Sequence, residues 1–308
     1  MNYYLGIDGG GTKTKVCLIN EFGTLVGFGE AGPSSIDTVS IQASIDEIVK
    51  AIHAISTPFP TMEVTSVFAG LGGVISQSHK SVVMKALRDT LMFSMDCHIW
   101  VENDVENALA SGQMFEEGIA LIVGTGMVAY GKSVDGIRHR AGGWGYKEGD
   151  AGSSYDVGLL AIRHAIKGYD KRIEMTPFLE AIASVIGLIR PEDIISIMDH
   201  LWEERTKIAS LAKLVTMYAN LGDPHAKSIV EHATDELTFC VKAVYTALDM
   251  PTMMYCIIGS LGNSEGLFHQ RLIEKIQISC PKLTLQKAVI DPALGAALLA
   301  KKSFENMK

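Results

Sequence analysis

The chain has 308 residues, of which 47% are hydrophobic and 20% are charged, a composition typical of a globular protein and not of a disordered one. Its length allows two domains of ordinary size, each with its own core. The formal net charge of −8 argues against a broad basic surface for nucleic acid or an anionic membrane, so bound phosphate would be met locally, by backbone amides or a metal.

The first third of the chain alternates strand and helix patterns. Short apolar runs predict five strands, at residues 3–7, 15–19, 25–29, 64–68 and 98–101. Apolar residues at helical spacing predict two helices, at residues 40–55 and 82–91. Three consecutive strands followed by alternating helices and strands indicate a mixed sheet flanked by helices.

The pattern restarts near residue 115. A second three-strand meander is predicted at residues 119–123, 128–132 and 137–140, and a long helical tract follows from about 153 to 247. A strand, a helix, a strand and a closing helix are then predicted at residues 253–258, 265–278, 283–286 and 292–301. Both halves open with a strand that enters a glycine-rich hairpin turn, which indicates a structurally duplicated α/β domain.

Cysteine usage and hydropathy indicate the setting of the protein. The five cysteines show no C-x-x-C spacing and lie in apolar contexts, which is typical of buried, reduced thiols. The sequence opens directly on a strand, which leaves no room for a leader, and no apolar stretch approaches the about 18 residues of a membrane helix. We therefore expect a cytoplasmic protein with no membrane or nucleic-acid partner.

The first glycine turn, Asp8-Gly9-Gly10-Gly11-Thr12, lies between two predicted strands. Glycines let backbone N–H groups approach an anion, the threonine hydroxyl adds a donor, and an aspartate can hold a hydrated Mg²⁺ against a phosphate. The segment does not fit the P-loop pattern, in which Gly-Lys-Ser/Thr opens a helix. An ordinary glycine hairpin turn with a solvated Asp8 is the alternative.

Five further motifs follow in order along the chain. They are Glu102-Asn103-Asp104-Val105-Glu106-Asn107-Ala108; Gly124-Thr125-Gly126; Gly142-Gly143-Trp144-Gly145 with Gly149-Asp150-Ala151-Gly152-Ser153; Ile257-Ile258-Gly259-Ser260-Leu261-Gly262-Asn263; and Asp291-Pro292-Ala293-Leu294-Gly295-Ala296-Ala297. With the first turn, these motifs resemble the superfamily of sugar kinases, actin and the Hsp70 ATPase domain. Within it the chain is similar to the N-acetylglucosamine kinase and BadF/BadG/BcrA/BcrD ATPase family, over essentially its whole length.

The resemblance implies an α/β fold of two ribonuclease H-like (actin-like ATPase) domains with a central inter-domain cleft. The first domain would comprise residues 1–115. The second would comprise residues 116–308, with a helical insertion and a last helix, about 291–301, that packs back toward the first domain. Domain closure around substrate would exclude water that could otherwise hydrolyse ATP.

The resemblance also implies an activity, the ATP-dependent transfer of the γ-phosphoryl group to the 6-hydroxyl of an N-acetylhexosamine, such as N-acetylglucosamine or N-acetylmuramic acid. Its cofactors would be ATP and Mg²⁺, its partners these small molecules, and its assembly a homodimer. Asp104 would be the catalytic base and Asp8 would hold Mg²⁺ through water. ATP would be bound by Gly10, Gly11, Thr12, Lys13, Gly124, Thr125, Gly126, Gly259 and Ser260. The sugar would be bound by Ser35, Asp37, Asp104, Gly143, Trp144 and Asp150.

Each of these acidic and aromatic residues also has a structural interpretation. Asn103 or Asp104 could equally cap the helix that follows, and the neighbouring carboxylates Glu102 and Glu106 compete with Asp104 for the role of base. Asp150 could cap the helix predicted from Ser153. Trp144 could be core packing, the commoner fate of tryptophan, or an apolar platform for a sugar face or acetamido methyl group.

Three positions depart from the family pattern. Ser35 stands where the family commonly has a sugar-binding asparagine, which nearby Asp37 could replace. Met127 stands where the second phosphate loop has a serine, and Ala151 stands where the sugar motif has a glutamate. These changes affect the identity of the sugar more than that of the nucleotide, because backbone amides carry most phosphate recognition.

Two other functions compete with the kinase. One is an ATPase of the activator type that couples hydrolysis to a partner protein, although such activators carry paired cysteines for an iron–sulfur cluster and the five cysteines here lack that spacing. The other is a non-catalytic sugar sensor, which Met127 and Ala151 favour and which the presence of Asp8 and Asp104 disfavours.

Overall fold

The computed structural model describes residues 2–55, 64–113, 117–147, 149–288 and 290–307. The chain forms two compact units, one made of Met1–Glu116 with Lys287–Lys308 and the other of Glu117–Gln286. The boundary expected at residue 115 lies outside the described residues. The segment from Lys287 onward groups with the first unit. The sequence-based division listed this segment with the second domain but expected its last helix, about 291–301, to pack back toward the first.

The first unit is built on a five-stranded mixed sheet in the order β3-β2-β1-β4-β5. Strands β1, β2 and β3 form an antiparallel meander, and β4 and β5 extend it in parallel from β1. The strands are β1 (Tyr3–Gly9), β2 (Thr14–Asn20), β3 (Leu25–Ala31), β4 (Val64–Leu71) and β5 (His98–Glu102). Because β3 is antiparallel to β2, the strands β1, β3, β4 and β5 all end at the same edge.

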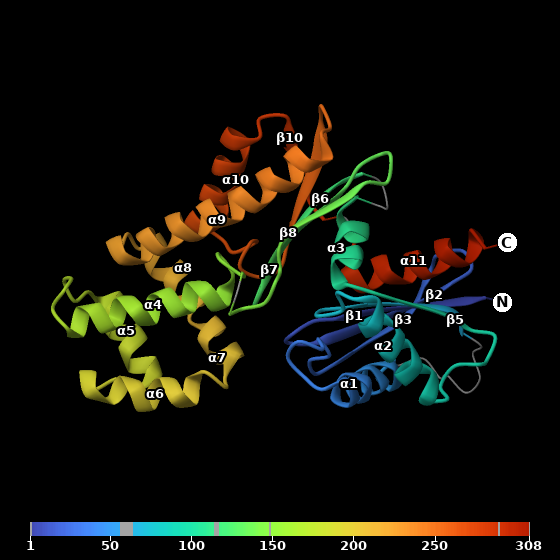
Figure 1. Cartoon of the computed structure of the whole chain (residues 1–308), viewed down its shortest axis with the longest axis horizontal. Helices are drawn as coiled ribbons and strands as arrows, with labels where there is room; N and C mark the ends of the chain where they lie inside the picture. Colours follow the sequence, from blue (N-terminus) through green and yellow to red (C-terminus); the bar gives the residue numbers. More distant parts are fainter. Residues whose placement is uncertain (1, 56–63, 114–116, 148, 289, 308) are drawn as a thin grey trace. The chain divides into compact units, whose positions relative to one another are not determined.

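Helices complete the first unit: α1 (Ile41–His53), α2 (Gln77–Asp89), α3 (Asp104–Gln113) and α11 (Pro292–Glu305). The serine that precedes α1 and the serine that precedes α2 each accept a hydrogen bond from the first helical turn, as N-caps do. Helix α11, red in Figure 1, lies beside α3 and packs on β1, β2 and β4.

Small residues allow α11 to approach the sheet closely. Its buried face consists of Ala293, Ala296, Ala297 and Ala300. Across from them, a Cβ atom at Gly6 would lie 2.2 Å from the carbonyl oxygen of Ala293. Gly6 is therefore fixed by packing, because no side chain fits between β1 and this helix.

The second unit repeats the first in its sheet. Its order is β10-β9-β6-β7-β8, with β6, β7 and β8 antiparallel and β9 and β10 added in parallel from β6. The strands are β6 (Gly118–Val123), β7 (Met127–Lys132), β8 (Arg138–Gly142), β9 (Met253–Ile258) and β10 (Leu283–Leu285). This common topology confirms the predicted duplication and the α/β class.

The predicted helical tract of the second unit is a series of helices. They are α4 (Ser154–Tyr169), α5 (Pro177–Ile186), the 3₁₀ turn η1 (Pro191–Asp193), α6 (Ile194–Leu201), α7 (Arg205–Ser210), α8 (Ala212–Asn220) and α9 (Pro224–Leu248), with α10 (Leu267–Ser279) between β9 and β10. Some of the breaks fall at a Pro or Gly, such as the left-handed Gly187 after α5 and Pro224 at the start of α9.

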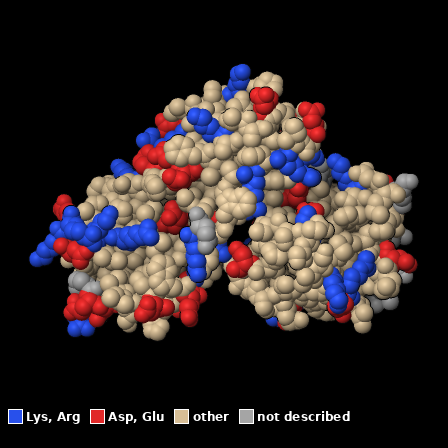
Figure 2. Space-filling view, viewed as in Figure 1, with Lys and Arg blue, Asp and Glu red and all other residues tan. Residues whose placement is uncertain are grey.

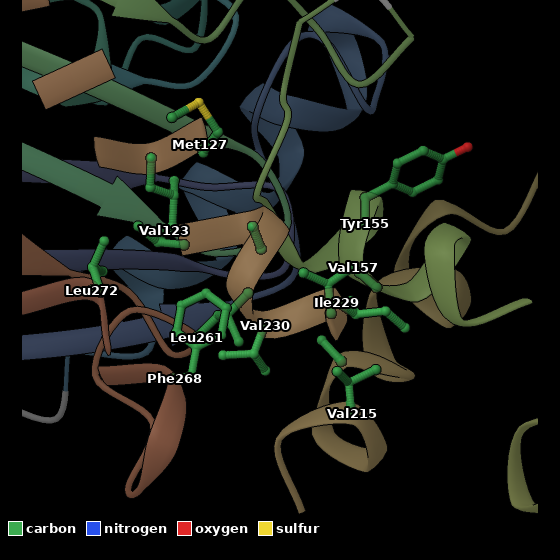
Figure 3. Packing of buried hydrophobic residues seen from close by; sticks show 14 of the residues in the cluster. Val123, Met127, Tyr155, Val157, Val215, Ile229, Val230, Leu261, Phe268 and Leu272 are labelled. Carbon is green, nitrogen blue, oxygen red and sulfur yellow. The ribbon is translucent and has the colours of Figure 1, made fainter. Parts of the chain in front are cut away.

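The core of the second unit joins its sheet to these helices. Figure 3 shows Val123 and Met127 at the sheet together with Leu261, Phe268 and Leu272 of the β9–α10 region. Val123 and Met127 flank the second glycine turn and are 0% and 3% exposed. The buried side chains of these two residues therefore anchor both ends of the turn in the core.

Within the described residues, no helix is both long and apolar enough to cross a membrane. On the face drawn in Figure 2, basic and acidic side chains are interspersed.

Candidate active site

The first glycine turn joins β1 to β2 at the edge where the parallel strands of the first unit end. The Gly10 amide donates to the Lys13 carbonyl at 3.0 Å, which closes the hairpin. The Gly10 carbonyl accepts from the amides of Ser34 and Ser35 at 3.1 and 3.2 Å. The turn is therefore tied to the segment that follows β3, while Thr12 and Lys13 are exposed.

The three glycines of this turn differ in whether the surrounding structure leaves room for a side chain. A Cβ atom at Gly9 would lie 2.3 Å from Leu71 and 2.4 Å from Ser34, so packing excludes a side chain there. At Gly10 and Gly11 the nearest atoms would be 3.4 and 3.6 Å away, which is ordinary contact, and neither has a positive φ. Neither packing nor backbone conformation within the first unit requires glycine at these two positions, which is the arrangement expected where a ligand approaches the backbone.

Asp8 lies near the end of β1 and its side chain is half-buried. Loss of hydration raises the pKa of its carboxyl group to about 6, an effect that Asp291 reinforces and that the Asn107 hydrogen bond, Lys15 and Lys13 oppose. Asn107 Nδ2 donates to Asp8 Oδ1 at 2.9 Å. A carboxylate held in this way next to a glycine turn suits a hydrated cation bound with phosphate.

Asp104 is the first residue of α3, directly after β5. Asn103 Oδ1 accepts from the Val105 amide at 3.3 Å, so Asn103 makes the capping contact at the start of this helix. Of the competing carboxylates, Glu102 forms an ion pair with Lys80 at 2.6 Å. The helix-capping interpretation of Asp104 is thus weakened. Glu102, a competing candidate for the base, is paired with a lysine of α2.

Ser35 and Asp37 lie next to Asp104. A Cβ atom at Gly72, which follows β4, would be 2.3 Å from Ser35 Oγ and 3.5 Å from Asp104 Oδ2. The Ser35 hydroxyl donates to Asp37, and Ser35 is only 3% exposed whereas Asp37 is exposed. The structure therefore brings together Ser35, Asp37 and Asp104, at the same sheet edge as Asp8 and its turn.

The second glycine turn, Gly124-Thr125-Gly126, connects β6 to β7. The Gly124 amide donates to the Gly126 carbonyl at 2.9 Å, and the Gly124 carbonyl accepts from the Ser154 amide at the start of α4. A Cβ atom at Gly124 would meet nothing within 4 Å, whereas one at Gly126 would lie 2.7 Å from Asp150. Gly124 thus resembles Gly10 and Gly11 in its open surroundings.

Gly259 brings the predicted adenosine motif against this second turn. It has a φ of +99°, and a Cβ atom there would lie 2.4 Å from the Val123 carbonyl oxygen. That carbonyl accepts from the amides of Leu261 and Gly262 at 3.2 and 3.3 Å. Ser260 is exposed beside it.

Trp144 is 63% exposed, so the core-packing interpretation is wrong. Its ring lies under the guanidinium carbon of Arg140 at 4.8 Å. Gly142 and Gly143, which precede it, have φ values of +74° and +70°, so the chain turns sharply after β8 and presents the indole outside the core.

Asp150 is 6% exposed and faces Arg205 at the start of α7, with its Oδ2 3.5 Å from Arg205 Nη2. The Arg205 guanidinium lies 4.8 Å from the ring centre of Tyr146, which packs edge-on against Tyr155. Ser153, and not Asp150, makes the side-chain cap of α4 by accepting from the Asp156 amide. The helix-cap interpretation of Asp150 therefore does not hold.

The departures from the family pattern also have places in the structure. The Met127 side chain lies in the core, as Figure 3 shows, so this position does not present a polar group to the turn. A Cβ atom at Gly142 would lie 2.5 Å from the Met127 sulfur, which shows how closely the methionine fills its space.

The predicted site residues divide into one group in each unit. Ser35, Asp37, Asp104, Asp8 and the turn 10–13 lie in the first, and Gly143, Trp144, Asp150, Gly259, Ser260 and the turn 124–126 lie in the second. Within the described residues, no three His, Cys, Asp or Glu side chains form a group that could hold a metal ion.

Sequence reasoning missed Asn107 and Arg205. Asn107 lies one helical turn after Asp104, so the i, i+3 relation inside the quoted motif could have drawn attention to it. Arg205 belongs to a helix far along the chain from Asp150, and no local signal announces their contact.

Comparison with known proteins gives a consistent picture. The model of the BadF/BadG/BcrA/BcrD ATPase family matches residues 5–300. An N-acetylmuramic acid/N-acetylglucosamine kinase of Clostridium acetobutylicum is 31% identical over 309 residues, covering 98% of this chain and 99% of the relative. An N-acetyl-D-glucosamine kinase of Dictyostelium discoideum is 29% identical and covers 96% of this chain and 97% of the relative.

Among solved structures, a proposed N-acetylglucosamine kinase of Chromobacterium violaceum superimposes with a TM-score of 0.75. It is 24% identical, and the match covers 97% of this chain and 98% of that one. This likeness concerns the fold, which is that of the two-domain sugar kinases.

Proposed function

This chain belongs to the BadF/BadG/BcrA/BcrD ATPase family, and on that premise we propose that it is an ATP-dependent kinase that phosphorylates the 6-hydroxyl of an N-acetylhexosamine. The observation that carries the proposal is the arrangement at one edge of the first sheet. There the ends of four strands bring Asp8, the open glycine turn, Ser35 and Asp104 together. A phosphate site and a candidate base thus share an edge, as phosphoryl transfer requires.

In the proposed reaction Asp104 accepts the proton of the sugar hydroxyl. The oxygen of that hydroxyl forms a bond to the γ-phosphorus, while the bond from the γ-phosphorus to the bridging oxygen breaks and ADP leaves with the electron pair. Ser35 and Asp37, which lie beside Asp104, would orient the sugar. The carboxylate of Asp104 would then be close to the hydroxyl that it deprotonates.

For the donor, we propose that the amides and hydroxyls of residues 10–13 and 124–126 bind the phosphates of ATP, and that Gly259 and Ser260 face its adenosine. The open positions at Gly10, Gly11 and Gly124 support this assignment, because a close approach to the backbone is what an added Cβ atom would block. Asp8 would hold Mg²⁺ through water, and one carboxylate suits an ion whose remaining ligands are waters and phosphate oxygens. When bound, Mg²⁺ would neutralise charge on the transferred group.

For the acceptor, the names of two relatives and the exposed Trp144 support an N-acetylated amino sugar. The indole would pack against an apolar part of the sugar, such as the acetamido methyl group, as aromatic side chains do in ligand sites. Asp150 and Gly143 would accept or donate hydrogen bonds at the sugar hydroxyls. We further propose that the enzyme acts in the cytoplasm as a homodimer.

A sugar panel tests the proposal. Purified protein is incubated with ATP and Mg²⁺ and with N-acetylglucosamine, N-acetylmuramic acid, glucosamine, glucose or no sugar, and ADP release is followed by a coupled assay. We expect release that depends on an N-acetylhexosamine, with phosphate found on the 6-oxygen by NMR of the product. ADP release that is indifferent to every sugar would instead favour the partner-coupled ATPase.

A further inference from the structure

The side chain of Asn107 is fully buried and connects three elements of the first unit. From α3, its Nδ2 atom donates to Asp8 Oδ1 at 2.9 Å, to the Ile7 carbonyl at 3.1 Å and lies 3.3 Å from the Gly70 carbonyl. One amide group thus contacts the end of β1, the end of β4 and the carboxylate proposed for Mg²⁺.

The surroundings of Asn107 leave it little freedom. A Cβ atom at Gly70 would lie 2.3 Å from both Asn107 Nδ2 and Asn107 Oδ1, so β4 keeps a glycine where this side chain crosses it. The main chain at Asn107 is closely packed as well, since its main-chain carbonyl oxygen would be 3.1 Å from a Cβ atom at Gly295 of α11. The side-chain amide is therefore closely packed against β4, and its hydrogen bonds fix its position relative to Asp8 Oδ1.

Asn107 also lies on the same face of α3 as Asp104, because residues three apart in a helix are neighbours. The helix that begins with the proposed base therefore carries the donor that orients the proposed Mg²⁺ carboxylate. If Asn107 served only to connect β1 to β4, its contacts with the Ile7 and Gly70 carbonyls would be enough, and a contact with Asp8 would not be needed. The shortest of the three contacts is the one to Asp8.

We infer that Asn107 is a positioning residue for the kinase reaction, which holds the Asp8 carboxylate in place for Mg²⁺-nucleotide binding and fixes it to the helix that presents Asp104. The inference rests on the proposed function. Hydrogen-bond partners of this kind, one step removed from a metal, typically affect metal affinity or activity about 10–100-fold when removed.

The test measures ADP affinity by calorimetry, with Mg²⁺ and with EDTA, for the wild type, Asn107→Ala and Ser111→Ala. Ser111 is the matched control, since it is fully buried on the same helix and its hydroxyl donates to the Ala108 carbonyl one turn earlier. We expect Asn107→Ala to bind ADP about 10–100-fold more weakly than the wild type in the presence of Mg²⁺. In EDTA the two proteins should bind ADP with nearly equal affinity. Ser111→Ala should change neither value.

A double-mutant cycle separates positioning from a general structural role. If Asn107 acts through Asp8, Asn107→Ala should have little further effect on Mg²⁺-dependent ADP affinity once Asp8→Ala is present. Additive effects, or equal losses with Mg²⁺ and with EDTA, would overturn the inference. Should Asn107→Ala fail to fold, Asn107→Leu, which has a similar shape and no donor, replaces it in the same cycle.

The outcome is distinguishable from failure of the proposed function. A wild type that binds Mg²⁺-ADP while Asn107→Ala behaves like Ser111→Ala contradicts only the inference. A wild type with no Mg²⁺-dependent ADP binding contradicts both.

Discussion

Asp8 and Asp104 are carboxylates at the ends of β1 and β5, two strands of one sheet with β4 between them, but their surroundings suit different tasks. Asp8 accepts from a buried amide in surroundings that raise its pKa to about 6. Asp104 is half-buried at the start of α3 beside Ser35 and Gly72, next to the segment where a sugar would be held. A carboxylate held by a buried amide suits a fixed cation, and a carboxylate at a helix start suits an acceptor hydroxyl.

For Asp104 we expect Asn substitution to lower kcat about 10²–10⁴-fold with sugar and nucleotide affinities nearly unchanged, because the amide cannot accept the proton. Steady-state kinetics and calorimetric binding check this. Glu102→Gln is the matched control, since Glu102 is engaged with Lys80. A loss of turnover in Glu102→Gln with Asp104→Asn active would exchange the two assignments.

For Asp8 the raised pKa predicts a pH-dependent stability. The native state binds the Asp8 proton more tightly than the unfolded state does, so the free energy of unfolding falls as pH rises from about 4 to 6 and stays lower above that. Asp8→Asn should therefore be more stable than the wild type by about 1–3 kcal/mol at pH 7.5 and nearly equal to it at pH 4. Chemical denaturation in EDTA measures both, with exposed Asp46→Asn as control; a gap that does not change with pH would contradict the assignment.

The sequence predicted which residue types form the site better than it predicted their contacts. Asp8, Asp104 and Asp150 were predicted from their motifs; Asp104 lies beside Ser35, and Asp150 lies against Gly126. The exposure of Trp144 was left open, because a glycine-rich loop can turn an indole inward or outward. Asn107 and Arg205 were missed because their importance arises from side-chain contacts between separate elements.

Among the elements, the glycine turns show how one residue type serves two purposes. Gly6 and Gly9 are glycines because other parts of the first unit occupy the space of a side chain. Gly10, Gly11 and Gly124 have room around them. Stability and ligand binding should therefore respond differently to the same substitution at neighbouring positions.

This difference is tested by a pair of alanine variants. Gly10→Ala should leave the melting temperature close to that of the wild type but raise the KM for ATP about 10–100-fold, the value of a lost hydrogen bond to a charged group. Gly6→Ala should do the reverse, with stability reduced by about 1–3 kcal/mol because α11 is displaced. Differential scanning calorimetry and steady-state kinetics report on the two effects. Gly10→Ala with unchanged KM would remove the turn from the nucleotide site.

The presence of most strands and helices was predictable from the sequence, because their apolar residues recur with a clear strand or helix periodicity. Strands expected at 3–7, 15–19 and 98–101 lie within β1, β2 and β5, and the restart near residue 115 corresponds to β6. Helix α2 begins at Gln77, earlier than the predicted 82, since its first turn is polar and its capping serine was not recognised. The placement of α11 in the first unit depends on small residues that fit a strand far away in sequence.

At the scale of the whole molecule, the two units have separate cores. One cluster of buried residues lies within the second unit, and two others lie within the first. We therefore expect each unit to unfold in a transition of its own, and a destabilising substitution in the core of one unit to lower the stability of that unit.

Two glycine variants test that independence. A Cβ atom at Gly29 of β3 would lie 2.0 Å from the Ala51 carbonyl oxygen, and one at Gly158 of α4 would lie 2.0 Å from the Ile208 carbonyl oxygen. In the apo protein, Gly29→Ala should destabilise the first unit and Gly158→Ala the second, each by about 1–3 kcal/mol. Hydrogen exchange followed by mass spectrometry assigns the loss to peptides of each unit. Equal loss of protection throughout the chain in both variants would show a single cooperative unit.

The membership of α11 in the first unit has a consequence for biosynthesis. The second unit is continuous in sequence, whereas the first lacks its covering helix until the ribosome has passed residue 287. At about 5–20 residues per second, synthesis of the intervening segment takes on the order of 10–30 s. During that time the sheet face formed by Tyr4, Cys17, Ile19 and Phe68 is uncovered. The part of the protein that is made first is therefore the last to be completed.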